Sequence, residues 1–326
     1  MSFTLELLKQ GREALQQQHQ SLETQKLYTL RIGNSGMYSE GKWYGQCPRR
    51  VIARYYGIQT EDTSGHRDSK FLMFDGGYTN EDSWVQLLTK AWRGNVLRET
   101  ECEVNTYIQS AEAPVPLSGR PDILLTDKLN QPVVGFELKQ VSSIWTARSV
   151  LVQGVPKLSH LCQALNYQIL LKAPAYELWY TARTKYPNFK FFGKLLFETE
   201  GETAVPAHLL QHCEFNDKGS IKALHPFMSG YKMELVDGKL VVTQMTRDFV
   251  GEPQPTIITL EGIQDFWGEI VKCIKSDRLP EAPESVDVFG NRLSYKSCDY
   301  CDAACQAACQ ADPKELGDWL THLNRA

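Results

Sequence analysis

Two carboxylates and a lysine lie at the ends of two segments whose composition favours paired strands. Residues 123–126 and 133–138 are apolar and rich in strand-forming residues, and the six residues between them are polar and end in proline, as a loop does. A symmetric loop places Asp122 directly opposite Glu137, where side chains lie about 4.5–5.5 Å apart. Two facing carboxylates repel each other unless a cation lies between them. The pattern therefore predicts a divalent-metal site with a lysine, Lys139, beside it.

The same symmetry fixes the rest of the register between the two strands. It pairs Ile123 with Phe136 and Thr126 with Val133. Because side chains alternate between the two faces of a strand, Lys139 shares the face of the glutamate two positions before it, and the neighbouring apolar residues point the other way. Charged residues at strand ends are also common on solvated surfaces, so the spacing by itself leaves a non-functional charged face open.

The composition is that of an ordinary globular protein with room for a large core. The chain has 326 residues, 42% of them hydrophobic, and a formal net charge of −4. This charge offers no overall attraction to nucleic acid, so DNA binding would need a local basic patch. No apolar run approaches the ~20 residues that span a bilayer, and the N-terminus lacks the apolar core of a secretory signal. We therefore expect a cytoplasmic protein without a membrane partner.

The remaining elements are expected from periodicity and from turn-forming residues. Predicted helices cover residues 1–27, 47–57, 80–92, 156–171 and 261–274. Predicted strands cover 103–108 and 176–183, with a hairpin at 231–235 and 240–244 turned by Asp237-Gly238. Loops are expected at 33–45 and 64–70, and a linker at 279–284. Most of 186–255 receives no assignment from the sequence. A helix, an acidic hairpin, a helix and a strand in this order favour one mixed α/β sheet flanked by helices.

Nine cysteines suggest a metal or redox centre in a reducing compartment rather than a secreted disulfide framework. Four of them are close together near the C-terminus: Cys298, Cys301, Cys305 and Cys309. If the chain is helical from Asp302 onward, the last three share a face. The four residues are compatible with a zinc site, with unreacted thiols, or with an iron–sulfur cluster that takes a ligand from elsewhere in the chain. The scattered cysteines are expected to be small buried hydrophobes: Cys102, Cys162, Cys213 and Cys273.

The acidic hairpin resembles the PD-(D/E)xK nuclease superfamily. The matching residues are Pro121-Asp122 before the first strand and Glu137-Leu138-Lys139 in the second. The resemblance implies a restriction-endonuclease-like fold, with a mixed central sheet flanked by helices, and a metal-dependent deoxyribonuclease activity. It implies that Asp122, Glu137 and the backbone carbonyl of Leu138 hold Mg²⁺ or Mn²⁺. Lys139 would position the attacking water or stabilise the transition state.

The cysteines extend the resemblance to the RecB-like iron–sulfur exonucleases, a branch that includes the CRISPR-associated adaptation exonuclease and its phage relatives. Cys47-Pro48-Arg49-Arg50 matches the first cysteine of the branch, at a helix start, and Cys298-Asp-Tyr-Cys301 matches its Cys-x-x-Cys. The last cysteine of the branch falls where this chain has Ala307, two positions after Cys305 and two before Cys309, so either is a candidate fourth ligand. The resemblance implies a [4Fe-4S] cluster that joins the N- and C-terminal ends of the fold.

Further positions match the same branch. Gln163 and Tyr167 fit its Gln-x-x-x-Tyr motif, and Glu81 stands where close members have a metal-binding histidine. A solvated glutamine, a core tyrosine and a helix-start acid are the structural alternatives. His160, one turn before Gln163, could contact a DNA phosphate or lie on the surface. Candidates for a basic track and for base stacking are Arg49, Arg50, Arg54, Lys157 and Arg183, with Tyr55, Tyr56 and Trp145.

We expect a single domain over residues 1–326, with a nuclease core at 47–185, an insertion at 186–255 and a cysteine-rich C-terminal region at 256–326. The resemblance implies an exonuclease that hydrolyses phosphodiester bonds of single-stranded DNA, in a bacterial cytoplasm or in that of a host if a phage encodes it. Two alternatives use the same residues: a catalytically silent DNA-binding or assembly subunit of this fold, and a zinc-stabilised interaction module. Opposed carboxylates beside a lysine argue against the silent subunit.

Overall fold

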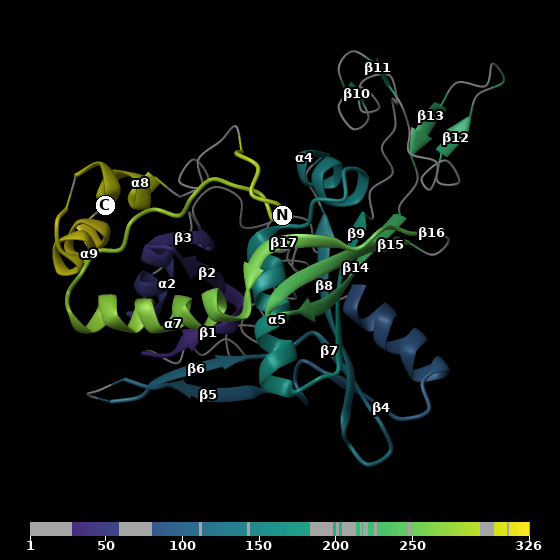
Figure 1. Ribbon diagram of the computed structural model, residues 1–326, viewed down its shortest axis with the longest axis horizontal. Helices are drawn as coiled ribbons and strands as arrows, with labels where there is room; N and C mark the ends of the chain where they lie inside the picture. The colour runs from purple at the N-terminus through teal and green to yellow at the C-terminus, as the bar shows by residue number, and fades with distance from the viewer. Residues whose placement is uncertain are drawn as a thin grey trace, which may run out of the picture.

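The computed structural model describes most of the chain, and the structural statements concern its described residues. These are 28–58, 80–110, 113–141, 144–182, 198–199, 202–203, 213–215, 217, 221–224, 227–246, 249–293, 303–311 and 313–325. The helix predicted at 1–27 and the loop predicted at 64–70 lie outside them. Figure 1 shows the described part as a central sheet with helices around it and a group of short helices at one side, near the C-terminus.

A mixed sheet lies at the centre of the described residues. Its eight strands are β4 (Asn95–Arg98), β7 (Ile123–Thr126), β8 (Pro132–Val141), β9 (Ala175–Ala182), β14 (Phe227–Val236), β15 (Lys239–Thr246), β16 (Phe249–Val250) and β17 (Gln254–Thr259). Their order is β16-β15-β14-β9-β8-β7-β4, with β17 paired to β15. β8 and β9 run parallel, and the other neighbours are antiparallel. The long helix α5 (Leu158–Leu171) lies in the connection from β8 to β9 and makes the crossover that a parallel pair needs.

Smaller sheets accompany the central one. They are built from β1 (Leu30–Arg31), β6 (Val115–Gly119) and β5 (Val104–Ile108), from β2 (Gly36–Ser39) and β3 (Lys42–Gly45), from β10 (Glu198–Thr199) and β11 (Glu202–Thr203), and from β12 (Cys213–Phe215) and β13 (Ile221–Leu224). The loop predicted over 33–45 is wrong, because β2 and β3 form an antiparallel hairpin there. Glu40 and Gly41 have positive φ angles of 51° and 79°, as a tight two-residue hairpin turn requires.

Helices follow the predicted pattern closely. The described ones are η1 (Ile32–Asn34), α2 (Pro48–Tyr55), residues 80–91, α4 (Ile144–Ala147), η2 (Arg148–Val152), α5, α7 (Leu260–Lys275), α8 (Ala303–Gln310) and α9 (Leu316–Arg325). The helices predicted at 47–57, 80–92, 156–171 and 261–274 are therefore confirmed. Proline in the first turn of α2 and Gly57 beyond its end, at a φ of 78°, explain its limits. None of the described helices has the length and apolar character needed to cross a membrane.

Helix α5 lies between the central sheet and the N-terminal strands (Figure 1). Its residues Leu161, Ala164 and Leu165 are fully buried in the main hydrophobic core, which also takes in residues of α2 and α7. The opposite face of the sheet is covered by helix 80–91, over a second, smaller core built around Val85, Ile123, Leu125 and Phe136. The protein is thus a mixed α/β structure with its sheet flanked by helices, as predicted.

The hairpin predicted at 231–244 is confirmed, and it belongs to the central sheet. β14 and β15 turn at Asp237 and Gly238, both with positive φ. β14 also pairs along its first seven residues with β9, from Phe227–Ala182 to Met233–Tyr176. Part of the segment assigned to an insertion therefore extends the central sheet, and the strand that carries Tyr176 is interior rather than at an edge.

The C-terminal helices dock against the end of α7. The backbone N–H of Leu316 donates to the carbonyl of Asp277 at 3.0 Å, and the N–H of Gly317 donates to its carboxylate at 2.8 Å. Arg49 of α2 donates through Nε to the carbonyl of Pro280 at 2.7 Å. These bonds hold the start of α2 against the chain that leads into the C-terminal region.

Candidate active site

The acidic hairpin has the predicted register at the end where the acids lie. Ile123 pairs with Phe136, and the pairing continues without a shift for two more residues of each strand. The register then shifts, so that Thr126 pairs with Pro132 and not with Val133 as predicted. A bulge of this kind inserts one residue into one strand, and the sequence pattern does not show it. Because the irregularity lies at the loop end, the faces of the acidic residues are as predicted.

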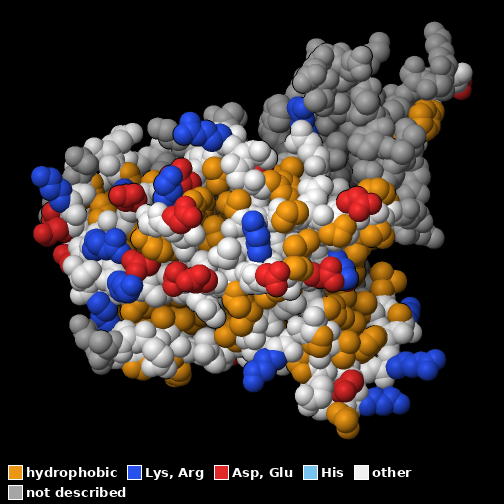
Figure 2. All heavy atoms as spheres, viewed as in Figure 1, with side chains coloured by type: hydrophobic (Ala, Val, Ile, Leu, Met, Phe, Trp, Pro, Cys, Tyr) orange, Lys and Arg blue, Asp and Glu red, His pale blue; other side chains and the backbone are white. Residues whose placement is uncertain are grey.

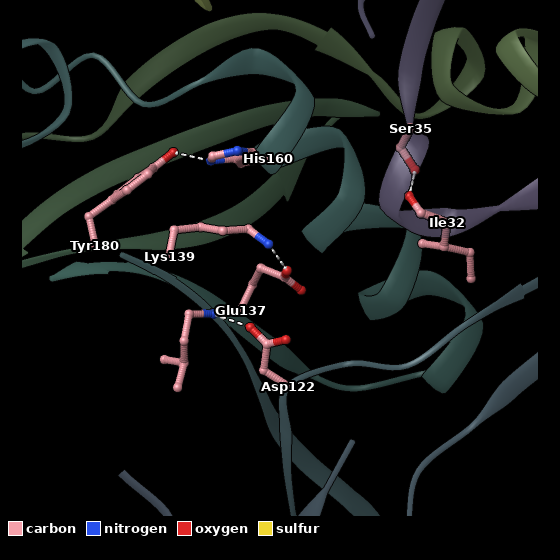
Figure 3. Close-up of polar contacts among 8 residues, drawn as sticks. Ile32, Ser35, Asp122, Glu137, Lys139, His160 and Tyr180 are labelled. Atoms are coloured by element: carbon pink, nitrogen blue, oxygen red, sulfur yellow. Dashed lines mark hydrogen bonds and ion pairs between the residues drawn. The ribbon is translucent and has the colours of Figure 1, made fainter. Parts of the chain in front are cut away.

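Asp122, Glu137 and Lys139 come together on one face of the hairpin, and we call these three residues the carboxylate site (Figure 3). Oδ2 of Asp122 accepts the backbone N–H of Leu138 at 2.6 Å, which fixes the aspartate against the neighbouring strand. Nζ of Lys139 donates to Oε1 of Glu137. Glu137 is 0% exposed, and its second oxygen, Oε2, is buried without a hydrogen-bond partner among the described residues.

Burial makes the negative charges of this site unfavourable. The pKa of Glu137 is raised to about 8, first by burial and then by the charge of Asp122, with Lys139 opposing the shift. Burial also raises the pKa of Asp122, against the effects of Lys139 and of the Leu138 N–H. Burial opposes the charge on Lys139, yet the two carboxylates raise its pKa. One ammonium group therefore does not compensate for the burial of both acids, and without a further cation Glu137 holds a proton at neutral pH.

Glu81 lies in the first turn of helix 80–91 and takes part in the same electrostatic environment. Its pKa is raised to about 8 by burial, then by Asp122 and Glu99, while Arg98 opposes the shift. The interaction with Asp122 places Glu81 near the carboxylate site, although its helix covers the other face of the sheet. Arg98 forms an ion pair with Asp82 at 2.9 Å and so holds the start of this helix to β4.

Gln163 and Tyr167 lie on α5, and the structure brings Tyr167 to the carboxylate site. The Tyr167 hydroxyl receives hydrogen bonds from the Gln163 side chain and from the backbone of Arg120. Its pKa is raised by burial and then by Glu137 and Asp122. The approach to the Arg120 segment depends on Gly119, because a Cβ there would lie 2.7 Å from the Tyr167 hydroxyl oxygen. Close packing against Tyr167 thus explains why a glycine precedes Arg-Pro-Asp.

Two further tyrosines of the site were not predicted from the sequence. Tyr176 pairs with Gly135 and Tyr180 pairs with Lys139 in the parallel β8–β9 ladder, so both point to the face of the acids. Tyr176 is fully buried with its hydroxyl unbonded among the described residues, and Glu137 and Asp122 add to the effect of burial in raising its pKa. The sequence signal is the spacing of Tyr176 and Tyr180, which places both on one strand face, and it points to the site only once the parallel pairing with β8 is known.

The donor atoms of the carboxylate site fit a hard divalent cation. Glu137 Oε2 has no hydrogen-bond donor among the described residues, and Asp122 has an oxygen beyond the one bonded to Leu138. Mg²⁺ and Mn²⁺ prefer carboxylate and carbonyl oxygens. Within the described residues, however, no three His, Cys, Asp or Glu side chains form a group that could hold a metal as they stand. Glu81 would have to approach further to complete such a group.

Arg49, Cys305 and Cys309 meet at the C-terminal end of the fold, and we call these residues the cysteine corner. Cys305 and Cys309 are one turn apart on α8, and Nη1 of Arg49 donates to Sγ of Cys309 at 3.2 Å. The pKa of Cys309 is lowered to about 5, first by the hydrogen bond from Cys305 and then by Arg49, which together outweigh its burial. Cys47 is buried at the N-cap of α2, two residues from Arg49, whereas Cys298 and Cys301 lie outside the described residues.

The structure describes only some of the residues proposed for a basic track and for base stacking. Arg49 is engaged in the cysteine corner, and Arg54 donates to Asn34. Tyr55 and Tyr56 pack edge to face with each other. Figure 2 shows basic and acidic side chains intermixed over the face in view, with no basic stripe along its described surface. Arg183 and the side chain of Trp145 lie outside the described residues.

Comparisons with known proteins add little to this site. No protein-family model matches the chain, and no curated protein matches it. A solved structure described as "Crystal structure of SSO0001" matches over 55% of this chain and 72% of that chain, with 20% sequence identity and a TM-score of 0.34. A likeness this weak carries no argument, and the chemistry of the site has to be derived from its residues.

Proposed function

We propose that the protein is a metal-dependent deoxyribonuclease that hydrolyses phosphodiester bonds of single-stranded DNA at the carboxylate site. The observation that carries the proposal is the buried oxygen Oε2 of Glu137, which has no proton donor among the described residues and belongs to a carboxyl group facing Asp122 beside Lys139. A buried polar atom without a partner is costly, and a cation between two acids removes that cost. Two acids and a lysine on one face supply the metal ligands and the positive charge that metal-assisted phosphodiester hydrolysis uses.

The order of the secondary-structure elements supports the PD-(D/E)xK hypothesis. Helix 80–91 precedes the central-sheet strands β4, β7 and β8, with β5 and β6 of a smaller sheet between β4 and β7. After β8 the chain passes through α4, η2 and α5 to β9, which pairs in parallel with β8. This is the helix, three strands, helix and strand order that the resemblance implies for a restriction-endonuclease-like core. The acids lie on β8 and directly before β7, where the resemblance requires them.

The roles of the residues follow from their positions. Asp122 and Glu137 would hold a Mg²⁺ or Mn²⁺ ion, with the carbonyl of Leu138 and with Glu81 as further ligands. When bound, the ion would supply an activated water and stabilise negative charge on the phosphate. Lys139 keeps an ammonium group on the same face and would stabilise the charge that develops in the transition state. Gln163 and Tyr167 would orient the phosphate backbone from α5.

The cysteine corner supports a second part of the proposal, a [4Fe-4S] cluster that joins the two ends of the fold. A thiol whose pKa is lowered to about 5 is a thiolate at neutral pH, the form that binds iron or zinc. Cys47, Cys298 and Cys301 would supply three ligands, and Cys305 or Cys309 the fourth. Anaerobic protein that is brown and absorbs near ~400 nm would support the cluster, and colourless protein with bound zinc would replace it by a zinc site.

A cleavage assay tests the nuclease proposal. Labelled single-stranded DNA, with free or blocked 5′ and 3′ ends, is incubated with Mn²⁺ and the wild-type protein, Asp122→Ala, Lys139→Ala or the control Asp265→Ala on the exposed face of α7. We expect metal-dependent cleavage that falls by about 10³-fold in the two site variants and is unchanged in the control. Unchanged cleavage by Asp122→Ala removes the assigned site. DNA binding without cleavage by the wild type would indicate a silent binding subunit.

A further inference from the structure

His160 lies at the edge of the carboxylate site and has no role in the chemistry described above. It is in the first turn of α5, three residues before Gln163 and seven before Tyr167, so the three side chains share one helical face. Tyr180 pairs with Lys139 in the β8–β9 ladder, so His160, Tyr180 and Lys139 are neighbours (Figure 3).

The hydrogen bonds around Tyr180 favour one tautomer of His160. The backbone N–H of Lys157 donates to the Tyr180 hydroxyl at 3.1 Å, which leaves that hydroxyl its own proton to donate. Its other partner is Nδ1 of His160, at 3.0 Å. A neutral imidazole that accepts at Nδ1 carries its hydrogen on Nε2.

Three neighbouring effects keep this imidazole neutral. Burial lowers the pKa of His160 well below its ordinary value, and the charges of Lys139 and Lys157 lower it further. Nε2 has no hydrogen-bond partner among the described residues. The ring is therefore a neutral N–H donor near Lys139 and adds no positive charge of its own.

We propose that His160 contacts the substrate phosphate, its Nε2–H donating to a non-bridging oxygen of the phosphodiester held at the carboxylate site, with Tyr180 as the positioning residue that fixes the tautomer. This inference rests on the proposed nuclease function and assigns that function a further binding residue. A neutral donor suits the position, because Lys139 and a bound divalent ion already supply positive charge there.

Two measurements on the full-length protein separate a phosphate contact from a packing role. With Ca²⁺ replacing Mn²⁺, binding of a labelled single-stranded oligonucleotide is followed by fluorescence anisotropy. We expect His160→Ala to weaken binding by about three- to tenfold, the size of one neutral hydrogen bond, and Tyr180→Phe to weaken it less. His160→Gln, which can place an amide N–H near the position of Nε2, should restore most of the loss.

The second measurement uses oligonucleotides with a phosphorothioate at the cleaved bond, each diastereomer in turn, with Mn²⁺. Sulfur accepts hydrogen bonds poorly, so one diastereomer should be cut more slowly by the wild type, and His160→Ala should abolish part of that difference. Equal sulfur effects in the wild type and His160→Ala, or unchanged binding by His160→Ala, would overturn the inference. If His160→Ala does not fold, the binding and sulfur measurements are made on His160→Gln and Tyr180→Phe. Wild-type binding and a wild-type sulfur effect in Tyr180→Phe would then count against the inference.

The same experiments keep the two proposals apart. Full cleavage by Asp122→Ala overturns the nuclease site itself. Loss of cleavage in Asp122→Ala together with an unchanged sulfur effect in His160→Ala leaves the nuclease proposal standing and removes only His160.

Discussion

The carboxylate site and the cysteine corner shift the pKa values of their acidic groups in opposite directions. At the carboxylate site burial raises the pKa of Glu137 to about 8, so the protein by itself disfavours the charge that a metal would need. In the cysteine corner the hydrogen bond from Cys305 and then Arg49 lower the pKa of Cys309 to about 5, so the protein itself stabilises the anion. The positive charge at the first region is too small to keep both acids ionised, whereas the second region has a cation, Arg49, beside its thiolate.

The two regions also differ in how far apart their residues lie along the chain. Asp122 and the N–H it accepts are 16 positions apart, within one hairpin. Arg49 and Cys309 are 260 positions apart and meet only because α8 and α9 dock against the end of α7. The carboxylate site should therefore depend on the local register of two strands, and the cysteine corner on the packing of the whole fold.

The largest effect that distinguishes the regions is expected from Glu137→Gln. This change keeps the shape of the side chain but removes the charge that would hold the ion, and we expect the cleavage rate to fall by about 10³-fold. Alkylation of Cys309 should stay at the wild-type rate, because no contact between the two regions is found among the described residues. Cleavage kinetics and peptide mass spectrometry measure the two effects, with Glu261→Gln, in the exposed first turn of α7, as the matched control. A parallel loss of Cys309 reactivity would show that the two regions are coupled.

The second prediction concerns the pH dependence of stability in the metal-free protein. Glu137 has an ordinary pKa of 4.5 and a folded pKa of about 8, so between these values the folded state binds more protons than the unfolded state. The free energy of unfolding should therefore be highest below about pH 4.5, as far as this group is concerned, and should fall as pH rises towards 8. The loss is on the order of a few kcal/mol.

Thermal unfolding in the presence of a chelator measures this loss as the difference between the wild-type protein and Glu137→Gln. Glu81, whose pKa is also raised to about 8, should add to the wild-type slope. Mn²⁺ should stabilise the wild type more at pH 8 than at pH 6, because the ion replaces the protons. A difference profile that is flat from pH 5 to pH 8 would contradict the raised pKa of Glu137.

The third prediction tests the approach of α5 to the carboxylate site. In Gly119→Ala the new Cβ would lie 2.7 Å from the Tyr167 hydroxyl oxygen and 2.8 Å from Cβ of Ile32, so one of them must move. We expect a loss of about 1–3 kcal/mol in the free energy of unfolding and slower cleavage, from displacement of Tyr167. Denaturant unfolding measures the loss. Gly268→Ala is the control, because it has open space on α7 and should be neutral or stabilising.

The predictability of the two regions follows from their construction. The strand face to which Glu137 and Lys139 point could be predicted, because alternation along a strand and the short loop determine it. The register shift at Thr126 could not be predicted. The loop predicted over 33–45 is wrong because its glycine- and serine-rich composition also suits the hairpin that turns at Glu40 and Gly41. Such errors arise where glycine and polar residues are compatible with both structures.

Contacts made by distant segments could not be predicted from residue patterns. Tyr180 enters the site through the parallel pairing of β8 with β9, which the sequence of either strand leaves open. Arg49 was expected among residues for a DNA track, and its bonds to Pro280 and Cys309 depend on the docking of α8. The bond from Arg49 to Cys309 brings α2 and α8 together, while the iron–sulfur cluster that the resemblance implies between the two ends stays a prediction.

The smallest effect is expected in the cysteine corner itself. In metal-free protein at pH 6, Cys309 should be mostly thiolate and should react with iodoacetamide before the cysteines whose pKa is raised by burial, such as Cys162 and Cys213. Arg49→Gln removes the cation and should slow this reaction by about three- to tenfold, because a higher pKa leaves less thiolate although each thiolate is more nucleophilic. Arg49→Lys should slow it less. Time-resolved alkylation with peptide mass spectrometry measures the rates, and cleavage by Arg49→Gln in the presence of Mn²⁺ should continue. An unchanged alkylation rate in Arg49→Gln would mean that Cys305, and not the guanidinium group, stabilises the thiolate.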